Sequence, residues 1–174
     1  MLEIGELNKD DVYEVMREVL YSLNYMWFQF EEWVKTNCPK EFESEGFQVL
    51  YRNFGSYQAK RLSRALAISG EGVDALVQLL KHSHWAVFEN IEITKLEGKR
   101  IRMRTIDCST QAAVKRWGMD YYECGAVASV MRNGFFQQAN QNSKIQRIFT
   151  PPETRPEGTP ENVSCEWLIS IEEG

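Results

Sequence analysis

Apolar residues in the N-terminal half of the chain recur every three or four positions, which is the spacing of one helix face. The first such stretch runs from Asn8 to Val34. It predicts one long amphipathic helix, with Asn8 or Asp10 as its N-cap and Pro39 beyond its end. Further helical stretches follow at 45–54, 56–68 and 71–84. We expect Gly55 to separate the first two of these, because glycine disfavours the interior of a helix.

The apolar positions change to a period of two after residue 87, which is the pattern of strands with one buried face. Odd positions are apolar on both sides of Gly98, so the turn must pair odd residues with odd ones. A three-residue loop at 96–98 satisfies this condition, and Gly98 supplies the left-handed residue that such a loop needs. The resulting register pairs Ile93 with Ile101, Ile91 with Met103 and Glu92 with Arg102.

The rest of the chain predicts two helices followed by two strands. They lie at 109–118, 123–140, 144–150 and 163–173. The order of elements is several helices, a hairpin, two helices and a second hairpin, which we write ααα-ββ-αα-ββ. It indicates an α+β fold in which the helical half covers one face of a four-stranded antiparallel sheet made of two hairpins. No linker divides the chain, so we expect residues 1–174 to form a single domain.

Composition and charge narrow the function classes. The hydrophobic fraction is 43% and the net charge is −5, so the chain is a globular protein without the excess of Lys and Arg that nucleic-acid binding requires. No apolar leader follows Met1, and no run approaches the ~20 apolar residues of a membrane-spanning helix. We therefore expect a cytoplasmic protein with reduced thiols that binds neither nucleic acid nor membrane.

The common nucleotide-binding and hydrolase motifs are absent from the sequence. The two histidines, His82 and His84, are open to two interpretations. Either one is a metal ligand or general base, or both are imidazoles placed favourably against the negative end of a helix dipole. The second interpretation is favoured, because residues two apart on a helix face different directions.

Three of the four cysteines are expected to converge at one corner of the fold. Cys108 ends the second strand, Cys124 begins the longer of the two helices that follow, and Cys165 lies on the apolar face of the last strand. Three interpretations remain open: inert packing in the core, ligation of a metal such as zinc, and a nucleophilic thiol. A tetrahedral zinc site would also need a fourth ligand.

Several segments together resemble a prokaryotic domain family without an assigned function. They are Trp27-Phe28, DCSTQAAVKRWG at 107–118, Cys124, PPETRP at 151–156 and CEW at 165–167. The segment ECGAVASVMRNG at 123–134 and the terminal cysteine strand also resemble the 4-vinyl reductase domain, a relative of the transport-protein-particle subunits. The C-terminal half is similar to L-2-amino-thiazoline-4-carboxylic acid hydrolase-like proteins.

The resemblance to 4-vinyl reductase implies a domain that binds small hydrophobic molecules, forms dimers and in some members holds zinc through cysteines and a glutamate. Carried over by position, Cys124 and Cys165 match the ligand cysteines and Glu153 the acidic ligand. Cys108 belongs to the pattern of the closer family. The hydrolase-like proteins imply instead a cysteine nucleophile that acts on cyclic amide or thiazoline-type compounds.

These observations lead us to expect a non-catalytic domain, sensory in role, that binds a small molecule or a metal. The alternative is the thiol hydrolase. Trp27 and Phe30 on the first helix are expected to face a ligand cavity between helices and sheet, because binding sites are concave and mostly apolar. The large apolar residues of the helical half also predict a homodimer that forms through helices.

Overall fold

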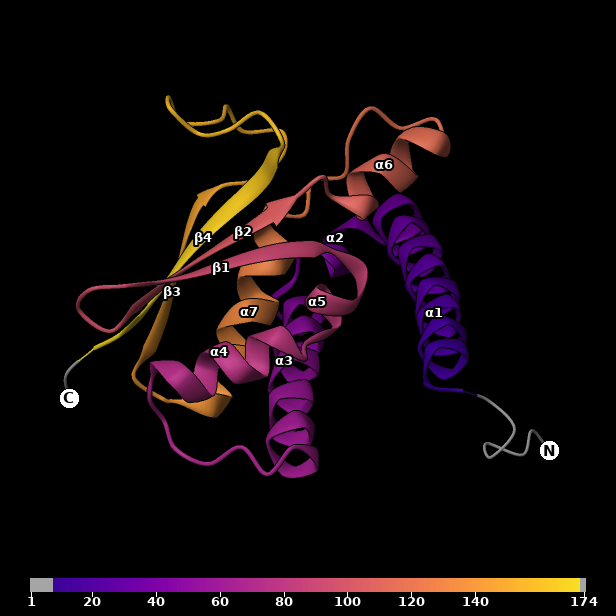
Figure 1. The fold of residues 1–174 in the computed structure, drawn as a ribbon. Helices are drawn as coiled ribbons and strands as arrows, with labels where there is room; N and C mark the ends of the chain where they lie inside the picture. The colour runs from indigo at the N-terminus through magenta and orange to yellow at the C-terminus, as the bar shows by residue number, and fades with distance from the viewer. Residues whose placement is uncertain (1–7, 173–174) are drawn as a thin grey trace. The chain divides into compact units, whose positions relative to one another are not determined.

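The computed structural model describes residues 8–172 of the chain. The chain forms two compact units, residues 1–44 and residues 45–174, which we describe separately. The first unit contains α1 (Lys9–Asn37) and α2 (Pro39–Phe42) (Figure 1). The second unit contains α3 (Glu45–Ala65), α4 (Val73–Lys81), α5 (His84–Phe88), β1 (Asn90–Leu96), β2 (Arg100–Ile106), α6 (Ser109–Arg116), α7 (Gly125–Ala139), β3 (Ser143–Phe149) and β4 (Val163–Ile171).

The long N-terminal helix begins and ends as its sequence predicts. The Asn8 side chain accepts hydrogen bonds from the backbone N–H groups of Asp10 and Asp11, at 2.9 and 3.0 Å. These bonds satisfy two of the donors that the first turn leaves without a helical partner. At the other end, Pro39 opens the short helix α2. Within residues 8–172, no helix has a long enough apolar stretch to cross a membrane.

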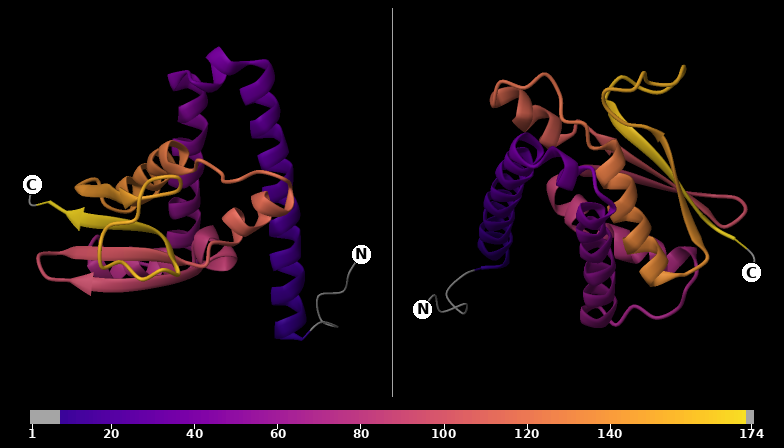
Figure 2. Two further views of the ribbon diagram at one scale, coloured as in Figure 1. Left: turned by 90° about the horizontal axis from the view of Figure 1, so that it is seen from above. Right: turned by 180° about the vertical axis from the view of Figure 1, so that it is seen from behind.

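The second unit contains an antiparallel sheet, ordered β1-β2-β4-β3, with helices packed on one of its faces (Figures 1 and 2). Odd-numbered residues of the central strands point toward the helices, because side chains alternate between the two faces of a strand. Among them Ile101, Met103, Trp167 and Ile169 are at most 1% exposed. The predicted α+β class and the antiparallel sheet of two hairpins are confirmed, but within residues 8–172 five helices, and not three, precede the first hairpin.

The first hairpin has a three-residue loop, but the loop lies one position later than the sequence predicts. Leu96 pairs with Arg100, which leaves residues 97–99 in the loop. Both Gly98 and Lys99 have positive φ, 70° and 56°, so the turn closes one residue beyond the glycine. The predicted register, with its Ile93–Ile101, Ile91–Met103 and Glu92–Arg102 pairs, is therefore wrong. The observed pairs are Ile93 with Met103, Ile91 with Thr105 and Glu92 with Arg104.

Gly55 does not separate two helices, as the sequence predicts, but lies inside the continuous helix α3. It is buried where α3 packs on α7, the most extensive helix–helix contact in the second unit (Figure 2). A Cβ atom at Gly55 would overlap the carbonyl oxygen of Met131, and one at Gly134 would overlap that of Arg52. The two glycines therefore bring the helix backbones close together. This packing outweighs the weak helix propensity of glycine.

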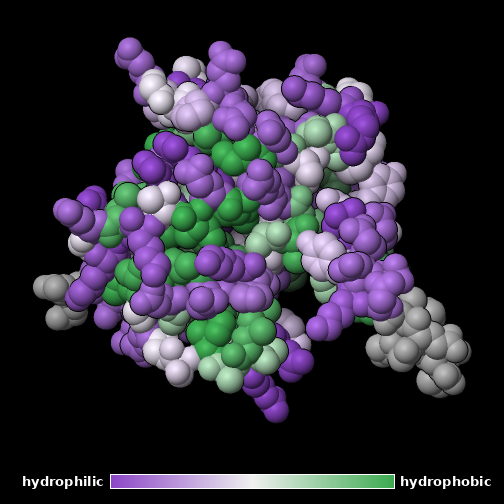
Figure 3. Space-filling view, in the orientation of Figure 1, coloured by the Kyte–Doolittle hydropathy of each residue, from purple (hydrophilic) through white to green (hydrophobic). Residues whose placement is uncertain are grey.

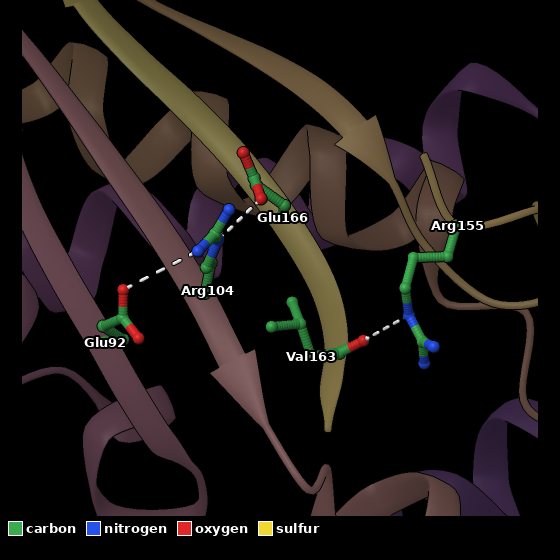
Figure 4. Close-up of polar contacts among 5 residues, drawn as sticks. All are labelled: Glu92, Arg104, Arg155, Val163 and Glu166. Carbon is green, nitrogen blue, oxygen red and sulfur yellow. Dashed lines mark hydrogen bonds and ion pairs between the residues drawn. The ribbon is translucent and has the colours of Figure 1, made fainter. Parts of the chain in front are cut away.

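The face of the sheet that carries no helices is polar at its centre. In Figure 3, which shows this side of the molecule, hydrophilic and hydrophobic residues are mixed over the surface. Arg104 Nε donates to Glu166 Oε2 at 2.7 Å, and its Nη1 lies 3.9 Å from Glu92 Oε1 (Figure 4). These cross-strand pairs tie β1, β2 and β4 together on the outer face.

Candidate functional site

Cys108, Cys124 and Cys165 share one region of the second unit: Cys165 raises the pKa of both Cys108 and Cys124, and Cys124 raises that of Cys108. Cys108 is the N-cap of α6 and Cys124 the N-cap of α7, while Cys165 is buried on the inner face of β4. Among the described residues 8–172, no three Cys, His, Asp or Glu side chains are arranged to hold a metal ion. The arrangement of these residues therefore does not fit the zinc that the resemblance implies.

Glu89, and not Glu153, is the carboxylate beside the thiols. Cys108 Sγ donates to Glu89 Oε1 at 3.6 Å. The same carboxylate accepts from the backbone N–H and the hydroxyl of both Ser109 and Thr110, at 2.7 to 3.4 Å, and so caps the N-terminus of α6. Glu153 pairs instead with Arg147 Nη2 at 2.9 Å and accepts from the backbone N–H of Thr150.

Burial keeps two of these thiols protonated. Burial, reinforced by the negative charge of Glu89, raises the pKa of Cys108 to about 12. Burial and the neighbouring Cys165 raise the pKa of Cys124 to about 11, although the positive charge of Arg132 acts in the opposite direction. Because the thiolate is the reactive form of cysteine, both side chains are weak nucleophiles at neutral pH.

Arg132 places a positive charge inside the core, next to the thiols. It lies on α7 and is 5% exposed. Its guanidinium carbon is 4.8 Å from the ring centroid of Trp85 and 4.4 Å from that of Trp167, so cation–π attraction to two indoles replaces part of its hydration. Its Nε has no hydrogen-bond partner among the described residues. We call Arg132, the two tryptophans and the three cysteines the arginine–thiol cluster.

His84 does not supply the general base that a thiol hydrolase needs. Its Nδ1 lies 2.8 Å from Gln58 Oε1, which requires the ring to donate there. Burial and the charge of Arg132 lower the pKa of His84 to about 3, so the imidazole is neutral at physiological pH. His82 is exposed, and its Nδ1 lies 2.8 Å from the carbonyl oxygen of Gln78. Within residues 8–172, no hydrogen bond joins either histidine to a cysteine.

A pocket of about 330 Å³ lies next to this cluster, between α6 and the loop that joins β3 to β4. From α6 and the residues after it, Gln111, Lys115, Asp120 and Tyr121 line the pocket. The opposite wall comes from the two strands and their connecting loop: Phe149, Pro151, Pro152, Glu153, Arg155 and Ser164. The pocket touches the cluster through Ser164, whose Oγ accepts from the backbone N–H of Cys108 at 3.0 Å.

Hydrogen bonds hold the walls of this pocket in place. The Gln111 side chain donates to the carbonyl of Tyr122 and accepts from its backbone N–H, at 2.8 and 3.0 Å, which fixes the segment after α6. Arg155 Nε donates to the carbonyl of Val163 at 3.2 Å, which fastens the loop to the start of β4 (Figure 4). Hydrogen bonds therefore fix the backbone that carries the polar groups of the pocket.

Trp27 and Phe30, the predicted ligand-binding aromatics, lie on α1 in the first unit. Their ring centroids are 5.6 Å apart, and the two side chains are 38% and 46% exposed. The pocket beside α6 is lined by residues of the second unit. Ligand binding by Trp27 and Phe30 stays a prediction.

A family model matches residues 6–171 of the chain, and it describes a family of unknown function, DUF6125. The chain belongs to this family. No curated protein and no solved structure matches the chain. The comparisons thus confirm membership in an uncharacterised family, and nothing in them links this DUF6125 member to the 4-vinyl reductase domain or to the thiazoline hydrolases.

Sequence reasoning missed the residues that define the electrostatics of this DUF6125 member. Glu89 and Trp85 belong to a stretch that the pattern divides between a helix end and a strand, whereas the structure forms α5 there. Arg132 lies within a helix of small and apolar residues, GAVASVMRNGFFQQA. A single charge in such a helix is the one sequence signal that points to a buried, functional or structural ion.

Proposed function

We propose that this protein is a non-catalytic small-molecule-binding domain whose ligand occupies the pocket between α6 and the β3–β4 loop. The observation that carries the proposal is the pocket itself. Its volume of about 330 Å³ lies at the lower end of the range for ligand sites, roughly 300–1,000 Å³. Tyr121, Phe149, Pro151 and Pro152 supply its apolar surface, and the other six lining residues are polar or charged, so the pocket suits a small ligand with a polar group.

The protonation of the thiols supports binding over catalysis. A cysteine hydrolase needs a thiolate, together with a base within hydrogen-bond reach that generates it. Cys108 and Cys124 have raised pKa values, and His84 is a neutral donor to Gln58.

The proposal includes a sensory role, a cytoplasmic location and assembly as a homodimer. The large apolar side chains that α1 leaves exposed, such as Val19, Leu23 and Met26, support assembly through helices. Sedimentation of the full chain tests this part, and a species of 20.3 kDa at micromolar concentration would contradict it.

Binding is tested by thermal unfolding of the full chain with a panel of small acids, amines and neutral aromatic compounds. We expect at least one class to raise the Tm. The variant Lys115→Trp, which places an indole at the wall of the pocket, should abolish the shift. Arg116→Trp, one residue along α6 and outside the pocket lining, should keep it. An equal response of both variants would contradict the assignment of the pocket.

Pulsed alkylation with iodoacetamide, read by peptide mass spectrometry, tests the non-catalytic part. The pKa of Cys124 is about two units above its ordinary 9.0, so at pH 8 it should react about 100-fold more slowly in the folded than in the unfolded protein. Cys108 should react more slowly still. A folded-state rate above the unfolded one at either residue would favour the hydrolase.

A further inference from the structure

Some charged side chains around the pocket already form an ion pair, and others do not. Glu153 is already neutralised by Arg147 and accepts from the backbone of Thr150. The Lys115 ammonium forms no hydrogen bond or ion pair within the described part of the chain, and neither do the two Nη groups of Arg155. The pocket therefore contains two positively charged groups that are free to bind a ligand.

Asp120 is the one pocket carboxylate that has no ion pair among the described residues. Two cations against one carboxylate give the pocket a net positive character, although the whole chain carries a charge of −5. This local positive charge favours an anionic ligand, because a cleft lined by one sign of charge attracts the opposite sign.

The hydrogen bond from Arg155 Nε to Val163 orients the guanidinium. With Nε anchored on β4, as Figure 4 shows, the two Nη groups remain as a pair of parallel donors. A planar fork of this kind matches the two oxygens of a carboxylate. Tyr121, Phe149 and Pro151 supply apolar surface in the same pocket.

We propose that the pocket binds a small organic acid, with its carboxylate on Arg155 and Lys115 and its apolar part against Tyr121, Phe149 and Pro151. This inference rests on the proposed function and names the class of ligand. It also defines Arg155 and Lys115 as the residues that determine specificity.

Isothermal titration of the full chain with three probes of similar shape tests the inference. Benzoate carries the carboxylate, benzamide is neutral, and benzylamine is a cation. We expect benzoate to bind at least tenfold more tightly than benzamide, and benzylamine not to bind. Lys115→Met and Arg155→Met should each weaken benzoate at least fivefold and leave benzamide unchanged. Arg155→Lys, which keeps the charge but loses the planar fork, should recover only part of the benzoate affinity lost in Arg155→Met, and Arg116→Met should match wild type.

The outcomes separate this inference from the proposed function. If benzamide or benzylamine binds as tightly as benzoate, and Lys115→Trp blocks that binding, the acid class is wrong while the pocket remains a binding site. Inorganic phosphate that competes more tightly than benzoate would also overturn the acid class. If no probe binds and the thermal panel shows no shift, both proposals fail.

Discussion

The arginine–thiol cluster and the neighbouring pocket both contain positive charge, but they hold it in opposite environments. Arg132 lies inside the core, between two indole rings, and is 5% exposed. Lys115 and Arg155 stand at the exposed wall of the pocket. Ser164 and the backbone of Cys108 are the link between the two regions.

This difference shows that burial determines whether a charged residue affects stability or ligand binding. In and around the cluster, burial is the main cause of the shifted pKa values of His84 and Cys108, and the charges of Arg132 and Glu89 reinforce it. At the pocket, water screens the cations and leaves them available to a ligand. Substitutions in the cluster should therefore change stability, and substitutions at the pocket should change binding.

The largest effect is expected at the helix crossing that supports the cluster. Alanine at Gly134 or Gly55 places a Cβ atom against the backbone of the facing helix. We expect each variant to lose more than about 2 kcal/mol of unfolding free energy, although Gly→Ala in a helix normally stabilises by about 1 kcal/mol. Urea unfolding followed by tryptophan fluorescence measures this. Gly72→Ser is the control, because no atom lies within 4 Å of a Cβ added there. Stabilisation by Gly134→Ala would refute the close approach of the α3 and α7 backbones.

Arg132 offers the next largest effect. Arg132→Ala leaves a cavity between Trp85 and Trp167 and should cost about 2–4 kcal/mol. Arg132→Met fills that space without a buried charge, whose desolvation costs several kcal/mol, and should be at least as stable as wild type. The same urea titrations decide the matter. If Met is as destabilising as Ala, the positive charge itself is required, and the negative charge of Glu89, which acts on Arg132, is the first candidate for its partner.

Acid should destabilise the protein, because His84 is held neutral in the folded state. Its folded-state pKa of about 3 lies below its ordinary value of 6.5, so between these two values the unfolded chain binds a proton at His84 and the folded chain does not. Stability should fall by up to about 1.4 kcal/mol per pH unit from 6.5 toward 3. Between pH 6.5 and 5, wild type should lose about 2 kcal/mol more than His84→Asn. Parallel pH profiles of the two proteins would show that His84 is not held neutral.

The smallest effect on stability is expected at the pocket wall. Lys115→Gln removes an exposed charge without an ion pair, and its unfolding free energy should stay within about 0.5 kcal/mol of wild type. The same variant should weaken benzoate binding several-fold. A loss of stability as large as that of Arg132→Ala would remove the contrast between the two regions.

Much of the fold follows from local patterns in the sequence. The cap at Asn8, the strands and their buried faces, and the helices that Cys108 and Cys124 cap all come from signals within a few residues. The hairpin register was missed because Lys99 adopts a positive φ beside Gly98, which residue type alone does not predict. Gly55 was missed because its role depends on α7, whose Gly134 lies 79 residues further along the chain.

The candidate site was less accessible to sequence reasoning. The three cysteines were visible as residues of interest, but their protonation depends on Glu89 and on burial that only the fold defines. The pocket is lined by α6 and by a loop about forty residues later in the chain. No local sequence motif indicates that these two segments lie close together. Sequence patterns therefore identified chemical groups, while their partners required the three-dimensional arrangement.

The backbone contact at Gly55 and Gly134 also has an evolutionary consequence. An enlarged side chain at either position would push α7 away from α3 and carry Arg132 out from between the indoles. Relatives that keep small residues at both positions should retain the stacked arginine, and relatives that lose one should lose the arginine as well. The two glycines thus form a marker by which family members that build this interior can be recognised from sequence.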